Sequence, residues 1–494
     1  MNHCVRWSSA AVCAALFYCM ASAAAPALMD AQTSRKTVSA LLISDVHFEP
    51  FWDPDKVPQL NSAPVSEWKN ILSSAASADQ AQKFADMQQK CHARGEDTPY
   101  PLLASSLKAI RAHSGGIGFA TVSGDLIAHY FDCKYGYVFP NYAKSDYTAF
   151  VEKTTSFVVS ELESIHPKAP VFIALGNNDS GCGDYQLDES SPYFAAIGKG
   201  ITDAVPAALR KDALASFSKG GYYSVPLPSP VQRTRLLVLD DIFMADGYTN
   251  CAGTSDPAGA ADELKWLGDQ LNEARAKREH VWVMAHVPTG VDPYGTLHGT
   301  CGNPTMFQGS EELADALTGA SDVVRVVLFA HTHMDEIKVL TAQNATSSSG
   351  GASRRAAGNE GLNAVAVKVL PSISPVNGNN PTFTLAEIDP ATAEIVDYRV
   401  YAASDATPAG TWAREYDYRS SYGQPSFSAA SVAQLIADFA KDSSASSKAS
   451  QNYIQHYEAG KKTPYIASQW PEYVCTMAQD SASGFAKCAC PSGP

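Results

Sequence analysis

The most constraining feature of this sequence is a series of short apolar runs, each followed within two residues by Asp, Asn or His. Such nearly continuous runs are typical of strands that are buried on both faces. They cover residues 37–44, 119–123, 170–175, 235–239, 281–285 and 323–330. Helical patterns lie between several of them, at residues 101–113, 147–165 and 261–277. The alternation of strands and helices predicts an α/β fold.

The polar residues at the ends of these runs form a second pattern. Open α/β sheets bind their ligands at the carboxyl ends of the strands. The motifs in sequence order are Asp45-Val46-His47, Gly124-Asp125, Gly176-Asn177, Ala285-His286 and His331-Thr332-His333. They offer carboxylates, one amide oxygen and several imidazoles, which suit two divalent metal ions of borderline softness.

The spacing of these motifs gives two further expectations. In an extended segment, D-x-H and H-x-H place both polar side chains on one face. The glycines before Asp125 and Asn177 allow a sharp turn where the backbone must pass close to the metals.

The remainder of the chain suggests how this core is extended. Residues 48–100 form an insertion between the first strand and the first helix. The segments 364–370, 382–388 and 394–401 follow one another without long helices, which predicts a second, more antiparallel sheet. Residues 341–359 are rich in Ser, Gly, Ala and Asn, which is typical of an exposed loop. From residue 429 onward, two helical stretches precede a cysteine-containing tail.

The ends of the chain indicate export. Arg6 precedes a short apolar run at residues 10–21, and Ala21-Ser22-Ala23 is a small-x-small cleavage site. We therefore predict a signal peptide at residues 1–25, a main domain at 26–410 and a C-terminal helical region at 411–494. The alternative to a signal peptide is a membrane anchor, for which the apolar run is short. No later stretch has the length of a transmembrane segment.

Cysteine usage agrees with a secreted or periplasmic location. Of 11 cysteines, eight remain after residue 25. They are Cys91, Cys133, Cys182, Cys251, Cys301, Cys475, Cys488 and Cys490. An even number in an exported chain predicts disulfides, although the sequence does not select their pairing.

The formal net charge of −14 argues against binding to a nucleic-acid polymer, because affinity for a phosphate backbone depends on clustered Lys and Arg. It does not exclude a phosphate ester as substrate, since a bound metal supplies positive charge locally. Nothing in the sequence indicates an oligomeric state.

The motif series resembles that of the calcineurin-like metallophosphoesterases, and more closely their acid sphingomyelinase-like phosphodiesterase branch. The supporting segments are Asp125 with Ala128-His129, then residues 286–290, 330–336, 371–375 and 380–383. The resemblance implies a sandwich of two mixed β-sheets flanked by helices, with a small C-terminal helical piece. It also implies two zinc ions and cleavage of phosphodiesters or pyrophosphates, on small-molecule or lipid substrates such as sphingomyelin or nucleotides.

Carried over motif by motif, the resemblance assigns the ligands. One metal would bind Asp45, His47, Asp125 and His333. The other would bind Asp125, Asn177, His286 and His331. Asp125 would bridge the two ions, and a bridging hydroxide would attack phosphorus.

One position departs from the family pattern, because Asn178 stands where the family usually has a histidine that protonates the leaving oxygen. An amide is no proton donor at useful pKa, although it can hydrogen-bond a phosphoryl oxygen. His129 is the first substitute for this acid and His298 the second. The departure keeps a phosphomonoesterase or polyphosphatase open as an alternative, as well as an exported binding protein without turnover.

Overall fold

The computed structural model describes residues 36–299, 303–342, 363–459 and 464–490 of the 494-residue chain. The predicted signal peptide, Cys301 and most of the predicted loop at 341–359 lie outside the described residues. The fold below is that of the unit that begins at Lys36.

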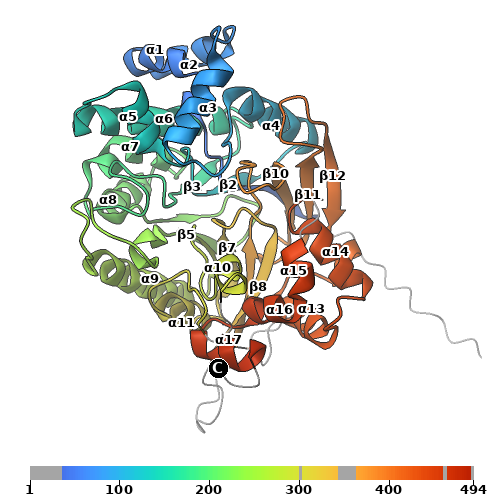
Figure 1. The fold of residues 1–494 in the computed structure, drawn as a ribbon. Coiled ribbons are helices and arrows are strands. Elements are labelled where there is room, and N and C mark those ends of the chain that lie inside the picture. Colours follow the sequence, from blue (N-terminus) through green and yellow to red (C-terminus); the bar gives the residue numbers. More distant parts are fainter. Residues whose placement is uncertain (1–35, 300–302, 343–362, 460–463, 491–494) are drawn as a thin grey trace, which may run out of the picture. The chain divides into compact units, whose positions relative to one another are not determined.

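Six strands form the first sheet, in the order β12-β11-β10-β1-β2-β3 (Figure 1). Their bounds are β1 (Val38–Ile43), β2 (Phe119–Ser123), β3 (Val171–Ala174), β10 (Thr382–Ile388), β11 (Ile395–Ala403) and β12 (Trp412–Asp417). β1, β2 and β3 run parallel, with helices in the connections between them, whereas β10, β11 and β12 are antiparallel additions. The first three predicted strands end within one residue of the observed ends.

Six further strands form the second sheet, in the order β4-β5-β6-β7-β9-β8. Their bounds are β4 (Tyr223–Pro226), β5 (Thr234–Val238), β6 (His280–Met284), β7 (Val324–Phe329), β8 (Glu336–Thr341) and β9 (Ala364–Val369). The four central strands are parallel, and β4 and β8 run antiparallel at the edges. The prediction of an α/β fold with two mixed sheets is confirmed.

The expected grouping of the last strands is wrong. β9 joins the second sheet in parallel beside β7, whereas β10 and β11 extend the first sheet from β1. Local sequence predicts that a segment is extended, but its partner is decided by which sheet edge remains open. No segment was predicted for β4, β8 or β12.

The two sheets face each other across the main apolar core. Alternate residues of β6 show this clearly, because Trp282 belongs to the core between the sheets whereas Val283 belongs to a cluster beneath α9 and α11. The ring of Phe119 on β2 lies 6.0 Å from that of Trp282, so the two sheets are in contact. Burial on both faces explains why the strands read as continuous apolar runs.

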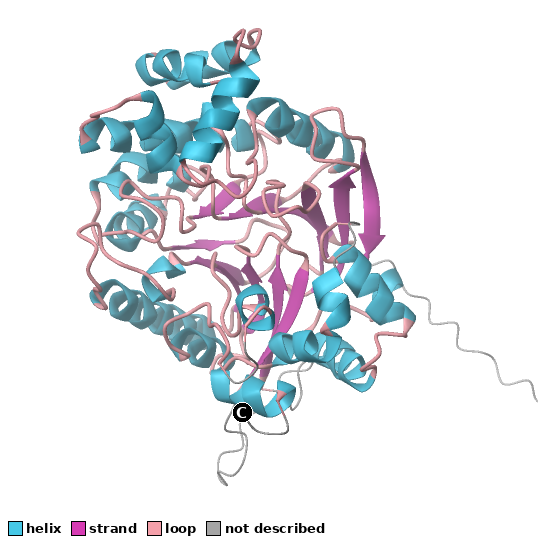
Figure 2. Ribbon diagram, in the orientation of Figure 1, coloured by secondary structure: helices cyan, strands magenta, loops and turns pink. Residues whose placement is uncertain are grey.

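Helices lie outside the strands of both sheets (Figure 2). Up to β8 they are α1 (Val57–Ser62), α2 (Val65–Ser73), α3 (Gln80–Lys90), α4 (Tyr100–His113), α5 (Phe131–Val138), α6 (Lys144–Glu163), α7 (Pro192–Thr202), α8 (Arg210–Gly220), α9 (Ala258–Lys277), α10 (Pro293–Leu297) and α11 (Glu312–Thr318). The C-terminal ones are α12 (Tyr418–Tyr422), α13 (Ala429–Lys441), α14 (Lys448–His456), α15 (Pro464–Ser468), α16 (Trp470–Ala478) and α17 (Ala482–Ala489). Among the described helices, none is both long and apolar enough to span a bilayer.

The segment predicted as an insertion contains α1, α2 and α3, which lie beside α5 and α6 in Figure 1. Cys91, at the C-terminus of α3, forms a disulfide with Cys133 in α5. This covalent link holds the insertion close to the segment that follows Asp125.

Among the C-terminal helices, α13 contacts β8 and β9 of the second sheet and α16 contacts β8, whereas α12 contacts β11 and β12 of the first sheet. The predicted boundary at residue 411 falls directly before β12, which pairs with β11 of the first sheet, and the helices begin at Tyr418. A disulfide between Cys475 and Cys488 joins α16 to α17.

Candidate metal centre

The carboxyl ends of the central strands bring together all seven side chains that the sequence suggested as metal ligands. We divide them into a first group, which is Asp45, His47, Asp125 and His333, and a second group, which is Asp125, Asn177, His286 and His331. In the first group, Nε2 of His47 lies 3.2 Å from Asp125 Oδ2 and 3.8 Å from Asp45 Oδ1. Nε2 of His333 lies 3.6 Å from Asp45 Oδ1.

The second group is equally close. Nε2 of His286 lies 3.2 Å from Asp125 Oδ2 and 3.0 Å from Asn177 Oδ1. Nδ1 of His331 lies 2.9 Å from the same Asn177 oxygen. Asp125 Oδ2 therefore lies within 3.2 Å of a histidine from each group, as expected of a carboxylate shared by two sites.

Hydrogen bonds to backbone carbonyls orient two histidine rings so that their Nε2 atoms face the centre of the site. His47 Nδ1 lies 2.9 Å from the Ile127 carbonyl, and His286 Nδ1 lies 2.7 Å from the Ser123 carbonyl. A carbonyl only accepts, so both Nδ1 atoms carry hydrogen, and both Nε2 atoms, which face Asp125, are left to carry a proton or to bind a cation. Nδ1 of the buried His333 has no hydrogen-bond partner among the described residues. Converging acceptors in a buried site require a positive charge between them, which fits divalent cations.

The pKa values show the same demand for positive charge. Burial alone raises the pKa of Asp125, but His286 and His47 hold it well below its ordinary value. Burial opposes charging of the two imidazoles, yet Asp125 outweighs it and raises the pKa of His47 to about 9 and that of His286 to about 10. The buried carboxylate thus attracts positive charge, which a divalent cation supplies as well as protons do.

The backbone at the site is strained. Asp45, His47, Asp125, His331 and His333 all have left-handed backbone, with φ between 41° and 73°. Such conformations are uncommon for residues other than glycine and cost on the order of 1–3 kcal/mol each. The expectation that D-x-H and H-x-H lie in extended segments is therefore wrong. The side chains converge because the chain turns sharply after β1 and β7, not because two residues share the face of a strand.

The expectation that these glycines lie where the backbone must approach its neighbours closely is confirmed. A Cβ on Gly124, where φ is 88°, would lie 2.7 Å from His286 Nδ1. A Cβ on Gly176 would lie 2.2 Å from Asp125 Oδ1. Both glycines are required because neighbouring loops meet at Asp125 without space for a side chain.

Two carboxylates that the sequence did not single out as site residues hold the loops of the site. Asp179 accepts hydrogen bonds from the backbone N–H groups of Leu126 and Gly176, at 2.8 and 3.0 Å, and so joins the loops that carry Asp125 and Asn177. Asp241 accepts the N–H of His286 at 3.1 Å. The only signal for Asp241 was its place directly after a strand.

His129 lies against the first group. Its ring stacks on that of His47 with centroids 3.9 Å apart. Its Nδ1 lies 3.0 Å from Asp97 Oδ1, and its backbone N–H donates to Asp97 Oδ2 at 2.8 Å. Because a carboxylate only accepts, Nδ1 carries hydrogen and Nε2 remains for a ligand.

Asp97 is a further residue that the sequence did not reveal, since it lies in the insertion without any motif. Ser374 Oγ donates to Asp97 Oδ1 at 3.1 Å, and Lys134 Nζ lies 3.6 Å from Asp97 Oδ2 while it pairs with Glu49. Burial raises the pKa of Asp97, but His129 and Lys134 reverse this effect and keep it well below its ordinary value. Asp97 therefore holds His129 as a buried anion.

The other two candidate catalytic residues lie differently. The backbone N–H and Nδ2 of Asn178 donate to the two carboxylate oxygens of Asp125, at 2.9 and 3.0 Å. Asn178 thus orients Asp125. His298 is exposed at the end of α10, where its Nδ1 lies 2.8 Å from the Tyr294 carbonyl and its ring lies beside Tyr465. Its described hydrogen bond and ring contacts are with these residues rather than with the metal-ligand candidates.

Two mixed sheets with a buried centre of Asp, Asn and His at their strand ends define a metallophosphoesterase-type protein. The sequence matches the calcineurin-like phosphoesterase family over residues 39–335, which is more than half of the chain. The chain belongs to the calcineurin-like phosphoesterase family.

Individual relatives refine this placement. The human acid sphingomyelinase-like phosphodiesterase 3b is 25% identical over 478 residues, covering 91% of this chain and 90% of that protein. The cyclic GMP-AMP phosphodiesterase SMPDL3A of Rattus norvegicus is 26% identical over 338 residues, covering 66% of this chain and 67% of that protein. Among solved structures, a dimetal phosphatase from Danio rerio matches with a TM-score of 0.39 and 11% identity, over 74% of this chain and 95% of that chain.

Proposed function

We propose that this protein is an exported phosphodiesterase that uses two divalent metal ions. The observation that carries the proposal is the convergence of the first and second groups on Asp125, with histidine Nε2 atoms turned inward by backbone carbonyls. The first group would hold one ion and the second group the other, with Asp125 shared. Imidazole and carboxylate ligands favour zinc.

The chain's own residues then prepare the site for a phosphodiester. When bound, the ions supply Lewis acidity toward water and toward a phosphoryl oxygen. Asn178 orients the shared carboxylate of Asp125, and Asp179 and Asp241 hold the loops on which Asp125, Asn177 and His286 lie. These contacts fix the ligands before the substrate arrives, so little reorganisation is needed in the reaction.

His129 is our candidate for the proton donor to the leaving oxygen. Asp97 holds Nδ1 of His129 and so leaves Nε2 to carry the transferable proton. The side chain of His129 is 27% exposed, so a substrate can reach it, whereas Asp97 is buried. His298 remains the second candidate, and its contacts with Tyr294 and Tyr465 favour a role outside the reacting centre.

The substrate we propose is a small-molecule or lipid phosphodiester. The names of the relatives include a sphingomyelinase-like phosphodiesterase and a cyclic GMP-AMP phosphodiesterase, and both kinds of substrate contain a phosphodiester linkage. Choline phospholipids and nucleotide diesters are therefore the first two classes to assay.

A phosphomonoester or polyphosphate is the second candidate, and one observation favours the polyphosphate. The position after Asn177 holds an amide that is committed to Asp125, so no imidazole is present at this position. A leaving group that is itself a phosphate needs less protonation than an alkoxide does. An exported binding protein without turnover is the remaining alternative.

Export is also part of the proposal. Its support is the predicted signal peptide together with three disulfides among the described residues, Cys91–Cys133, Cys182–Cys251 and Cys475–Cys488. We propose that the mature chain begins near residue 26, with a main domain to about residue 410 and the helical region after it. Sequencing the N-terminus of the mature protein tests this; an intact Met1 on exported protein would contradict it.

The test of the activity combines metal analysis with a substrate panel. We expect two ions per chain by mass spectrometry of the metals, and faster hydrolysis of bis-p-nitrophenyl phosphate than of the monoester. Sphingomyelin, cyclic dinucleotides and polyphosphate complete the panel. A preference for the monoester or polyphosphate would favour the second candidate, and two bound ions without any hydrolysis would favour the binding protein.

A further inference from the structure

The segment after Asn178 returns to the metal-ligand candidates through two side chains that no motif predicted. Asp184 Oδ1 accepts a hydrogen bond from Asn177 Nδ2 at 2.7 Å. The Tyr185 hydroxyl lies 3.0 Å from His331 Nε2. Two neighbouring residues thus contact two members of the second group, and neither contacts a member of the first group through a described hydrogen bond.

The contact with Asp184 fixes the orientation of the Asn177 amide. A carboxylate only accepts, so the amide nitrogen must face Asp184 and the amide oxygen must face the other way. That oxygen lies 3.0 Å from His286 Nε2 and 2.9 Å from His331 Nδ1. Without Asp184, the amide could turn and present N–H groups to the site instead of a ligand oxygen.

The contact with Tyr185 acts on the imidazole of His331. A histidine that binds a metal ion does so as a neutral imidazole. A neutral imidazole has one N–H, and a hydroxyl oxygen that accepts it at Nε2 leaves the lone pair on Nδ1, beside Asn177 Oδ1. The second ring nitrogen of a metal-binding histidine is commonly held in this way.

The position of Tyr185 is enforced by its backbone. Its φ is 54°, a left-handed conformation that a tyrosine rarely adopts. Its N–H donates to the Asn177 carbonyl at 3.0 Å, and its carbonyl accepts the N–H of Thr249 at 3.1 Å. The strained residue is therefore held between the ligand-bearing loop and the segment that contains Cys251.

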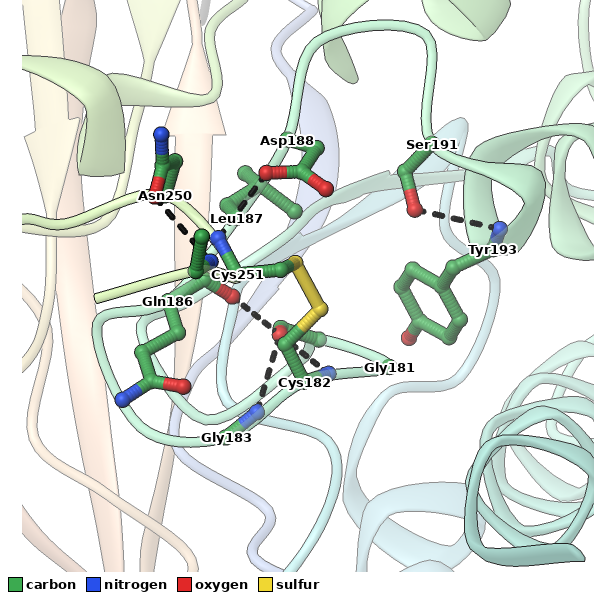
Figure 3. The surroundings of a disulfide bond; sticks show 12 residues. Gly181, Cys182, Gly183, Gln186, Leu187, Asp188, Ser191, Tyr193, Asn250 and Cys251 are labelled. Carbon is green, nitrogen blue, oxygen red and sulfur yellow. Dashed lines mark hydrogen bonds between the residues drawn. A yellow bond between two sulfur atoms is a disulfide. The ribbon is translucent and has the colours of Figure 1, made fainter. Parts of the chain in front are cut away.

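A disulfide fastens this segment on its outer side. Cys182 is bonded to Cys251, and Cys251 N–H donates to Asp188 Oδ1 at 2.8 Å (Figure 3). On the same loop, the Cys182 N–H donates to Ser180 Oγ at 2.9 Å. Asp184 and Tyr185 lie between the two attached ends, Cys182 and Asp188, so the loop has little freedom to move them away from the second group.

We infer that Asp184 and Tyr185 are positioning residues that set the metal affinity of the second group, and that the Cys182–Cys251 loop holds them in place. Asp184 keeps the Asn177 oxygen directed at the ion, and Tyr185 keeps the Nδ1 lone pair of His331 available to it. The inference rests on the proposed function, because it requires the second group to hold a cation. It predicts two ions of separable affinity, of which only one depends on this loop.

The test measures Zn²⁺ binding to the full mature chain by competition with a chromogenic chelator. We expect Asp184→Ala and Tyr185→Phe each to weaken one of the two Zn²⁺ affinities by about 10–100-fold and to leave the other unchanged. Asp184→Asn keeps an oxygen acceptor and should recover part of the loss. The melting temperature of the metal-free variants should stay close to that of the parent, because the changes remove no buried apolar surface.

Tyr248→Phe is the matched control. Its hydroxyl donates to the Leu187 carbonyl at 2.9 Å, so the variant loses a hydrogen bond to the same loop without touching the second group. The inference would be overturned if Asp184→Ala and Tyr185→Phe both bound two Zn²⁺ ions with the affinities of the wild-type protein. An equal loss in Tyr248→Phe would also overturn it, because this would indicate general loosening of the loop. If the parent protein itself does not bind two Zn²⁺ ions, the proposed function is wrong. That result differs from one in which the parent binds two ions and the variants bind them equally well, which contradicts only the inference about the loop.

Discussion

The two groups of the candidate metal centre are supported in different ways. In the first group, Asp45, His47 and His333 are at most 1% exposed, and His47 is oriented by a backbone carbonyl of the neighbouring loop. In the second group, Asn177 and His331 are oriented by side chains of a surface loop, where Asp184 is exposed and Tyr185 half-buried. The first group therefore depends on the core of the protein, and the second depends on a loop that a disulfide holds.

This difference teaches that affinity for one ion can change without repacking the core. Substitutions in a surface loop cost little folding stability, whereas changes at fully buried ligands cost much more. A dinuclear site built in this way can adjust one ion and keep the other. The four predictions below test the comparison, beginning with the change that should abolish it.

Asp125→Ala should remove the distinction by damaging both groups. Asp125 Oδ2 lies 3.2 Å from His47 Nε2 and from His286 Nε2, so its loss leaves each group without its shared carboxylate. We expect the protein to lose both ions and hydrolysis of bis-p-nitrophenyl phosphate to fall by more than about 100-fold, the upper end for loss of a ligand's hydrogen-bond partner. Metal analysis of the purified variant provides the measurement, and retention of two ions would contradict the shared role.

His129→Ala should sharpen the comparison by testing chemistry on the side of the first group. If His129 protonates the leaving oxygen, kcat for esters with poor leaving groups should fall by about 100-fold, and that for activated esters should fall less. Asp97→Asn should produce a weaker version of the same pattern, because the hydrogen-bonded anion is lost. The series of leaving groups is to be run in parallel on His298→Ala. A leaving-group dependence in His298→Ala alone would reverse the assignment.

Removal of disulfides should distinguish the effect of the Cys182–Cys251 loop on metal affinity from the general effect of a disulfide on folding stability. Cys182→Ser with Cys251→Ser and Cys475→Ser with Cys488→Ser should each lower the free energy of unfolding by about 3 kcal/mol. Only the first pair lies beside Asp184 and Tyr185, so only that double variant should also weaken one Zn²⁺ affinity. Equal metal affinities in the two double variants would show that the loop holds its shape without the covalent bond.

The smallest effect is expected at low pH, at a histidine that belongs to neither group. Burial lowers the pKa of His456 to about 4, since its ring stacks on Tyr416 at 3.9 Å and its Nδ1 lies 3.1 Å from the Tyr422 hydroxyl. The charge of Asp335 acts in the opposite direction. Below about pH 6.5, His456 becomes protonated in the unfolded chain but stays neutral in the folded chain. The free energy of unfolding therefore decreases as the pH falls toward about 4.

Protonation of His456 in the unfolded chain should lower the free energy of unfolding by about 2 kcal/mol between pH 8 and pH 5. Denaturant unfolding of His456→Gln should therefore show a pH dependence smaller by that amount over the same range. Identical slopes for the parent and the variant would contradict the assignment. The comparison also identifies how much acid instability belongs to the C-terminal helices rather than to loss of metal from either group.

Much of the fold could be predicted because burial on both faces leaves a local trace. The runs at 119–123 and 382–388 coincide with β2 and β10. The pairing of the later strands was predicted wrongly, because no feature of the segment 382–388 indicates that it pairs with β1. The partner of a strand depends on residues hundreds of positions away.

The candidate site shows the same division. Asp45, His47 and the H-x-H pair stood out because they follow apolar runs and repeat a recognisable spacing. Asp97, Asp184 and Tyr185 did not, because each lies in a loop without a motif and gains its meaning only from the side chain it contacts. A polar residue whose partner is distant in sequence carries no signal of its own.

The left-handed backbone at Asp45, His47, Asp125, His331 and His333 has a consequence for protein engineering. Apart from glycine, the residues that best tolerate this conformation are Asn, Asp and His, and among these Asp and His are also good ligands. Exchanging Asp45 for glutamate would change the reach of the carboxylate and the preferred path of the main chain together. Designers who wish to recruit another metal would therefore have to rebuild whole turns rather than swap single donors.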